Sequence, residues 1–151
     1  MKSASIKAWI GMTLCASLFS FSRIGGEGFT IHLNNKLLLE HHFTSKSVTP
    51  SFSLDKNSAN GELSIYYNEC GQIGKQRSLT LKDDKGLVLK NWRFVNAEKE
   101  HTPMAIQVKD ILALTQKTST TLKLYYNSQR VSDGRLLANI IQSDDVKASR
   151  K

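Results

Sequence analysis

The stretch "LSIYYNECGQIGKQRSLTL" (residues 63–81) contains the pattern that decides the fold. Every second residue from Leu63 to Tyr67 is apolar, and Leu79 and Leu81 repeat this spacing near the end of the stretch. A period of two is typical of β-strands that bury one face. Two glycines in the middle permit the positive φ angles that tight turns need. The stretch therefore predicts a strand, a glycine-containing turn and a second strand.

The same alternation recurs in short runs from residue 29 to residue 143. Turn-forming segments such as "DKNSANG" (residues 55–61) and "DDKG" (residues 83–86) separate these runs. One segment, "VKDILALTQK" (residues 108–117), instead has the spacing of a short helix. Short strands separated by turns predict an all-β fold, an antiparallel β-sandwich of about eight strands with at most one short helix.

The segment "FTIHLNNKLLLEH" (residues 29–41) predicts the first hairpin. A three-residue Asn-Asn-Lys loop would pair Leu33 with Leu37 and Ile31 with Leu39, which collects the apolar side chains on one face. A two-residue Asn-Asn turn would pair Leu33 with a lysine and mix the faces. The pattern therefore favours the three-residue loop.

A weak internal repeat links two of the expected strands. The run "LSIYYN" (residues 63–68) returns as "LKLYYN" (residues 122–127), and an alternating run that begins with Thr-Pro precedes each copy. Chance similarity between two β-strands is one explanation. The other is a fold of two pseudo-repeats, residues 28–85 and 86–143, which would then have the same strand order.

The N-terminal segment has three parts. Lys2 and Lys7 give a positive start, an uncharged and mostly apolar run follows (residues 8–21), and then the glycine-rich "SRIGGEG". This is the layout of a secretory signal peptide, and the apolar run is shorter than the about 20 residues that span a membrane. A lipid anchor on Cys15 and an uncleaved anchor are the alternatives. The predicted organisation is a signal peptide (residues 1–22), a short linker (23–28), a β-sandwich domain (29–143) and a flexible polar tail (144–151), with no transmembrane span after cleavage.

Basic residues exceed acidic ones, 21 Lys and Arg against 13 Asp and Glu, for a formal charge of +8. Loss of the signal peptide removes Lys2 and Lys7 and lowers this charge to +6. A basic surface attracts anions. We therefore expect an envelope protein, a glycan or another anionic surface component as partner, and no nucleic acid. Cleavage also removes Cys15, which leaves Cys70 a free cysteine without an intrachain disulfide.

Cys70 is the one candidate for covalent chemistry. Lys75 and Arg77 are near it in the sequence, and basic neighbours favour the reactive thiolate. A cysteine hydrolase also needs a histidine beside the nucleophile, and nothing in the sequence directs one of the four histidines toward Cys70. Gly71 and Gly74 are too close together for a phosphate loop, and the histidines lack zinc-ligand spacing. We therefore predict a possible reactive thiol but no catalytic residue, metal site or cofactor.

The tyrosine doublets are the strongest candidates for a binding surface. If Tyr67 and Tyr126 face the core, alternation turns Tyr66 and Tyr125 outward. An exposed tyrosine beside asparagine and lysine suits contact with a sugar or a protein. The predicted ligand- or partner-binding residues are Tyr66 and Tyr125 as anchors and Lys75, Arg77 and Arg135 as charge partners.

The run "LSIYYNECGQIGKQRSLTLKD", followed by "VLKNWRF", resembles a pattern of small uncharacterised exported proteins of Bacteroidota bacteria, over much of residues 29–140. The resemblance implies a Gram-negative periplasm or cell surface and carries over no catalytic residue. We expect an exported binding or structural module of the cell envelope, and not an enzyme. The alternatives are an envelope hydrolase or thiol enzyme that uses Cys70 with a histidine, and an assembly subunit that acts by strand addition.

Overall fold

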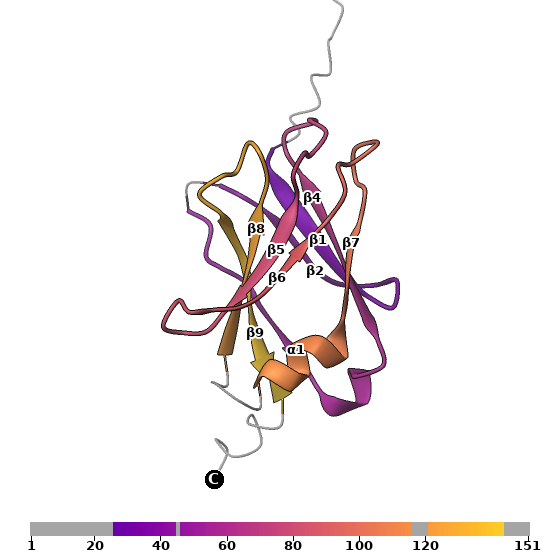
Figure 1. Ribbon diagram of the computed structural model, residues 1–151, viewed down its shortest axis with the longest axis vertical. Helices are drawn as coiled ribbons and strands as arrows, with labels where there is room; N and C mark the ends of the chain where they lie inside the picture. Colours follow the sequence, from indigo (N-terminus) through magenta and orange to yellow (C-terminus); the bar gives the residue numbers. More distant parts are fainter. Residues whose placement is uncertain (1–25, 45, 116–120, 144–151) are drawn as a thin grey trace, which may run out of the picture.

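The chain forms a sandwich of two β-sheets (Figure 1). The computed structural model describes residues 26–44, 46–115 and 121–143. The predicted all-β sandwich with one short helix is confirmed. The predicted signal peptide, the polar tail and the first half of the linker (residues 23–25) lie outside the described residues. No helix in the described part is long and apolar enough to cross a membrane.

Each sheet draws strands from both halves of the chain. The four-stranded sheet contains, in spatial order, β2 (Lys36–His42), β1 (Gly28–Leu33), β4 (Glu62–Asn68) and β7 (Met104–Gln107). The five-stranded sheet contains β3 (Ser51–Leu54), β9 (Arg135–Gln142), β8 (Thr121–Asn127), β5 (Ser78–Lys82) and β6 (Val88–Arg93). Neighbouring strands are antiparallel, except that β3 and β9 are parallel. A 3₁₀ turn, η1 (Lys56–Ser58), follows β3, and the helix α1 (Val108–Thr115) follows β7.

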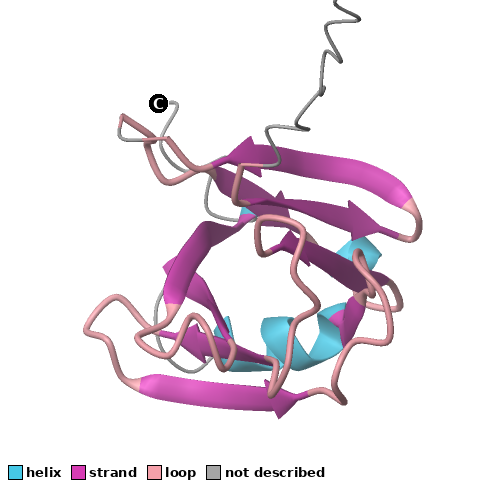
Figure 2. Cartoon of the chain, turned by 90° about the horizontal axis from the view of Figure 1, so that it is seen from above, coloured by secondary structure: helices cyan, strands magenta, loops and turns pink. Residues whose placement is uncertain are grey.

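The inward positions of the alternating strands form the core. Figure 2 looks along the sandwich and shows the two layers, with α1 across the far end. Val108, Ile111 and Leu112 are the apolar side chains that α1 buries. Each fully buried leucine or isoleucine contributes about 1.5–3 kcal/mol. The fully buried strand residues include Ile31, Leu63 and Ile65 in one sheet and Leu79, Leu81, Leu122 and Leu124 in the other.

The strand order resembles that of an immunoglobulin-type sandwich. Strands β9, β8, β5 and β6 occupy the places of strands G, F, C and C′, and β1, β4 and β7 those of A, B and E. In such a sandwich the B–C and F–G connections lie at the same end. Here these are the β4–β5 and β8–β9 connections, which lie at the end opposite α1 (Figure 1).

The first hairpin corrects the predicted loop. Asn34 and Asn35 have φ angles of 49° and 66°, so they form a two-residue turn and Leu33 pairs with Lys36. Asparagine tolerates the left-handed region better than most residues, which favours this turn. A register shift after Ile31 then places Ile31 opposite Leu39, as predicted. A bulge therefore restores the apolar face that the turn alone would have disrupted.

The strand order contradicts a duplication of the fold. In the first proposed repeat β1 pairs directly with β4. The corresponding strands of the second are β6 and β8, and β5 lies between them. The repeated run instead places Tyr67 and Tyr126 face to face between the sheets, with ring centroids 4.0 Å apart and planes inclined by 20°.

Candidate functional site

The connection from residue 69 to residue 77 crosses from one sheet to the other. It leaves β4 of the four-stranded sheet and enters β5 of the five-stranded sheet. Glu69 and Gln72 form a single bridge within it, and Cys70, Gly71 and Gln76 have positive φ angles. The predicted strand–turn–strand reading is correct, but the two strands are not a hairpin. The connection instead closes one end of the sandwich.

Two buried tyrosines support two carboxylates at this end. Tyr67 and Tyr126 are 8% and 1% exposed, as the predicted alternation requires. The Tyr126 hydroxyl donates a 2.5 Å hydrogen bond to Glu69 Oε1, and the Tyr67 hydroxyl donates one to Glu27 Oε1. Burial is the main cause that raises the pKa of each phenol, and its carboxylate partner adds to the shift. Both phenols therefore remain protonated donors at neutral pH.

The two predicted anchors do not share a surface. Tyr66 lies on the outer face of the four-stranded sheet, where it packs edge-on against His32 with ring centroids 5.1 Å apart. Tyr125 lies on the outer face of the five-stranded sheet. The two faces are on opposite sides of the sandwich, so one flat partner surface cannot contact both tyrosines. Alternation shows which residues point outward, but it does not show to which sheet a strand belongs.

Arg77 is a structural group and not a charge partner. Its side chain is 5% exposed. Nη1 donates to the Thr102 carbonyl at 2.7 Å, and Nη2 donates to the Val95 carbonyl at 3.1 Å. Burial lowers the pKa of Arg77. The guanidinium therefore fastens the β6–β7 connection, which agrees with its position on the apolar side of the alternation. Lys75 is exposed and lies in a shallow hollow beside Arg130.

The five-stranded sheet is basic throughout. Its five strands contain no Asp or Glu and five bases. Lys90 pairs with Asp110 of α1 at 3.8 Å, and Arg135 pairs with Glu27 at 2.9 Å. We call the outer face of this sheet the basic face, defined by the three remaining bases and one tyrosine, Lys82, Arg93, Lys123 and Tyr125.

Lys82 and Lys123 are direct cross-strand neighbours on the basic face. Tyr125 is two residues along β8 from Lys123, and the Lys82 ammonium lies 4.5 Å from the centroid of its ring. Beside Tyr125, Asn91 Nδ2 donates to Thr80 Oγ1 at 2.7 Å. The cation pair and the aromatic ring therefore lie on β8 and β5, and the neutral polar groups lie beside them on β5 and β6.

A groove of about 410 Å³ brings two of the predicted binding residues together. Tyr125 and Arg135 both line it, together with Leu136, Phe43 and Pro50. The Arg135 guanidinium lies 5.0 Å from the centroid of the Phe43 ring. The groove opens beside the basic face at Tyr125, so it extends that face toward the loop end.

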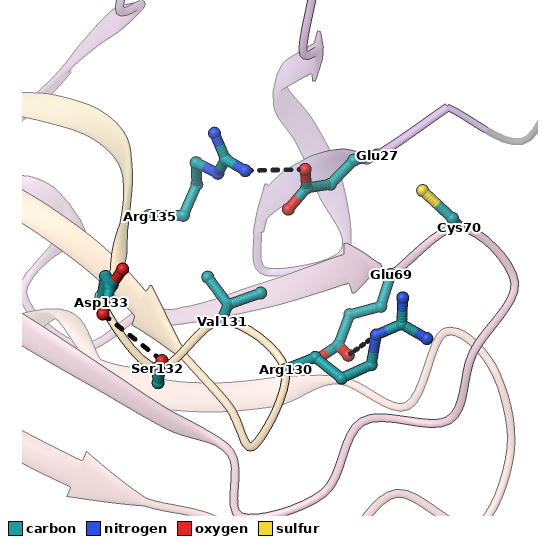
Figure 3. A pocket seen from close by; sticks show the side chains of 9 residues that line it. Glu27, Glu69, Cys70, Arg130, Val131, Ser132, Asp133 and Arg135 are labelled. Atoms are coloured by element: carbon teal, nitrogen blue, oxygen red, sulfur yellow. Dashed lines mark hydrogen bonds and ion pairs between the residues drawn. The ribbon is translucent and has the colours of Figure 1, made fainter.

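Arg135 also borders a second hollow at the loop end, which we call the loop-end cleft (Figure 3). It has a volume of about 420 Å³. The predicted reactive thiol, Cys70, is exposed at its edge, and none of its lining residues is a histidine. The lining residues are Glu27, Glu69, Cys70, Arg130, Val131, Ser132, Asp133, Gly134 and Arg135.

The β8–β9 connection holds its shape through local hydrogen bonds. The Ser128 hydroxyl is buried and accepts from the backbone N–H groups of Arg130 and Val131, at 3.2 Å each. Gly134 has a φ of 80°, and a side chain there would approach Asn127 Nδ2 to 2.8 Å. Glycine is therefore required at this point, and it fixes where Arg135 leaves the loop.

In the described part of the chain, no group of three or more His, Cys, Asp or Glu residues is arranged to hold a metal ion. Comparison with known proteins adds no relative: no family model matches the chain, and no curated protein matches it significantly.

Sequence reasoning missed the bases of the basic face and the carboxylates of the cleft. Lys82 and Lys123 do have a readable signal, because each occupies an outward position in an alternating strand. Glu27 and Glu69 have none, because they lie outside the strands and meet tyrosines distant in sequence.

Proposed function

We propose that the protein is an exported, non-catalytic β-sandwich module of the cell envelope that binds an acidic glycan on its basic face. The signal-like N-terminal segment and the resemblance to exported proteins support the location. The absence of a histidine from the lining of the cleft beside Cys70 favours binding over thiol catalysis.

The pairing of Lys82 with Lys123 is the observation that carries this proposal. Directly opposed side chains on one face of a sheet have Cβ atoms about 5 Å apart, and like charges at that distance destabilise the sheet. No acidic residue in any of the five strands offsets this repulsion. A bound carboxylate or sulfate group between the two ammonium groups would offset their repulsion, which favours the pair as an anion site.

The spacing of the cations suits a polymer better than a small anion. Arg93 pairs with Ser78, which is four residues from Lys82 along β5. At about 3.4 Å per residue, the backbone positions of these two bases lie about 14 Å apart along the strand direction. Tyr125 pairs with Thr80, midway along β5 between the positions of the two cations, and adds an aromatic ring beside Lys82. Asn91 adds an exposed amide on β6. An acidic polysaccharide supplies repeated anions, ring faces and hydroxyls along one chain.

The test measures binding of the mature protein to polygalacturonate by calorimetry, with neutral dextran as a reference polymer. Lys123→Glu should weaken binding at least about tenfold, which corresponds to about 1.4 kcal/mol. Lys36→Glu makes the same charge change on the four-stranded sheet and should leave the affinity within about twofold. Equal affinity of Lys123→Glu and wild type would contradict the proposal. Equally tight binding to single-stranded DNA would show that the face recognises charge and not a glycan.

Strand addition has one specific observation in its favour. β2 is a seven-residue strand at the edge of the four-stranded sheet, and no described strand pairs with its outer side. Exposed edges of this length template pairing with another chain. If β2 does so, sedimentation should show association that rises with protein concentration. Leu37→Lys, which adds a charge at a side chain that is 47% exposed, should suppress this association. A monomer at all concentrations would exclude self-assembly through β2.

A further inference from the structure

Glu69 is a buried carboxylate at the loop-end cleft with one oxygen unused. Its side chain is 3% exposed, and Oε1 accepts the hydrogen bond from the Tyr126 hydroxyl. Oε2 is buried and has no hydrogen-bond partner among the described residues. Buried polar atoms are nearly always hydrogen-bonded, and an unsatisfied charged acceptor is especially unfavourable. A hydrogen-bond donor that reached Oε2 from the cleft would therefore stabilise Glu69.

Arg130 does not meet this requirement. Its nearest nitrogen, Nε, lies 4.0 Å from Glu69 Oε2, which is beyond hydrogen-bond distance. The Arg130 side chain is 59% exposed and comes from the β8–β9 loop (Figure 3). A loosely placed guanidinium on an exposed side chain can move aside at little cost. Arg130 therefore partly neutralises Glu69 and covers its second oxygen without a hydrogen bond to it.

The charge of the cleft is opposite to that of the chain. Three carboxylates line it, on Glu27, Glu69 and Asp133, against two guanidiniums, on Arg130 and Arg135. Glu27 and Arg135 neutralise one another at 2.9 Å. The remaining groups leave one negative charge, in a protein whose formal charge is +8. The side chains that line the cleft therefore carry a net negative charge, unlike those of the basic face, and the buried Arg77 guanidinium interacts with Glu69 from the protein side.

The carboxylates are held in place before any ligand arrives. Glu69 and Glu27 each accept a hydrogen bond from a buried tyrosine, Tyr126 and Tyr67, and the two rings stack in the core. Rigid support of this kind lowers the ordering cost of binding. The free oxygen of Glu69 is thus a fixed acceptor at the base of a hollow.

We propose that the loop-end cleft binds the cationic side chain of a partner peptide, a lysine ammonium or an arginine guanidinium, with Glu69 Oε2 as the acceptor. The incoming cation displaces the Arg130 guanidinium, and its N–H donates the hydrogen bond that Oε2 lacks. This site is separate from the basic face, so it does not depend on the proposed glycan binding.

The test is a titration of the ¹⁵N-labelled mature protein, followed by amide shifts of the 69–72 and 128–134 connections. The probes are N-acetyl-lysine-methylamide and N-acetyl-arginine-methylamide, with N-acetyl-norleucine-methylamide as the uncharged reference. Both cationic probes should shift these amides saturably, and the norleucine probe should not. Saturation by only one of the two would identify the side chain that the cleft prefers and would support the site.

Two variants at the site should change the affinity in opposite directions. Glu69→Gln removes the charge but keeps the shape, and it should weaken cationic binding at least tenfold. Arg130→Gln removes the competing cation and should strengthen binding severalfold, an outcome that loss of structure cannot produce. Glu40→Gln, a carboxylate on the exposed edge of β2, is the matched control and should change nothing.

Three results would overturn the inference: no shift with either cationic probe, equal affinity of Glu69→Gln and wild type, or weaker binding by Arg130→Gln. Polygalacturonate binding, measured on the same Glu69→Gln variant, distinguishes cation binding in the cleft from glycan binding on the basic face. It should be unchanged, because Glu69 does not lie on the basic face.

Discussion

At the scale of single residues, the molecule combines two carboxylate–tyrosine pairs that differ in burial. Glu69 is almost fully enclosed and depends on Tyr126 for its hydrogen bond. The Glu27 side chain is 23% exposed and has Arg135 as well as Tyr67. A charged group with several partners and access to water loses less when one partner is removed. The two tyrosines should therefore contribute unequally to stability.

Replacement of each tyrosine by phenylalanine tests this difference. Tyr126→Phe leaves both oxygens of Glu69 without a hydrogen bond and should lower the free energy of unfolding by about 1.5–3 kcal/mol. Tyr67→Phe keeps the ring in the same stack and should cost clearly less. Urea unfolding at neutral pH gives both free energies. If the free energy of unfolding depends on urea concentration with the same slope in both variants, the two values can be compared directly. Equal losses would mean that the deeper burial of Glu69 does not make its tyrosine more important for stability than Tyr67.

At the scale of elements, alternation predicts the strands and their buried faces, because burial of one face requires a period of two. The helical spacing of residues 108–117 likewise predicts the helix, which is found at Val108–Thr115. The first turn is predicted wrongly because a bulge can correct a register shift that the turn introduces. The sheet to which each strand belongs is not predictable from spacing, because the connection after β4 crosses between sheets instead of forming a hairpin.

For the candidate sites too, spacing predicts which residues point outward but not which of them come together. Tyr125 and Arg135, two of the predicted binding residues, line one groove because β8 and β9 pair. Their role in binding stays a prediction. Tyr66 faces away from them because its strand belongs to the other sheet, which spacing does not reveal. Arg77 is buried, as its position on the apolar side of the alternation indicates. The cleft combines the start of β1 with two loops from distant parts of the chain. No local pattern could bring these segments together.

At the scale of the whole molecule, charge is segregated between the two sheets and the loop end. The strands of the five-stranded sheet contain bases without acids, whereas β2 and β4 of the other sheet contain Glu40 and Glu62. Concentrating like charges on one sheet lowers stability through repulsion. A fold that retains such an arrangement at a binding surface exchanges stability for affinity, as functional sites commonly do.

This exchange predicts that one substitution improves stability and removes binding. Lys123→Glu turns the like-charge pair with Lys82 into an opposite-charge pair, which should raise the free energy of unfolding by about 0.2–1 kcal/mol. The gain should shrink as salt is added, because screening weakens both the original repulsion and the new attraction. Urea unfolding at low and high ionic strength measures both effects. A less stable Lys123→Glu protein would show that the lysine pair is not under repulsion, and it would remove the physical basis for an anion site between Lys82 and Lys123.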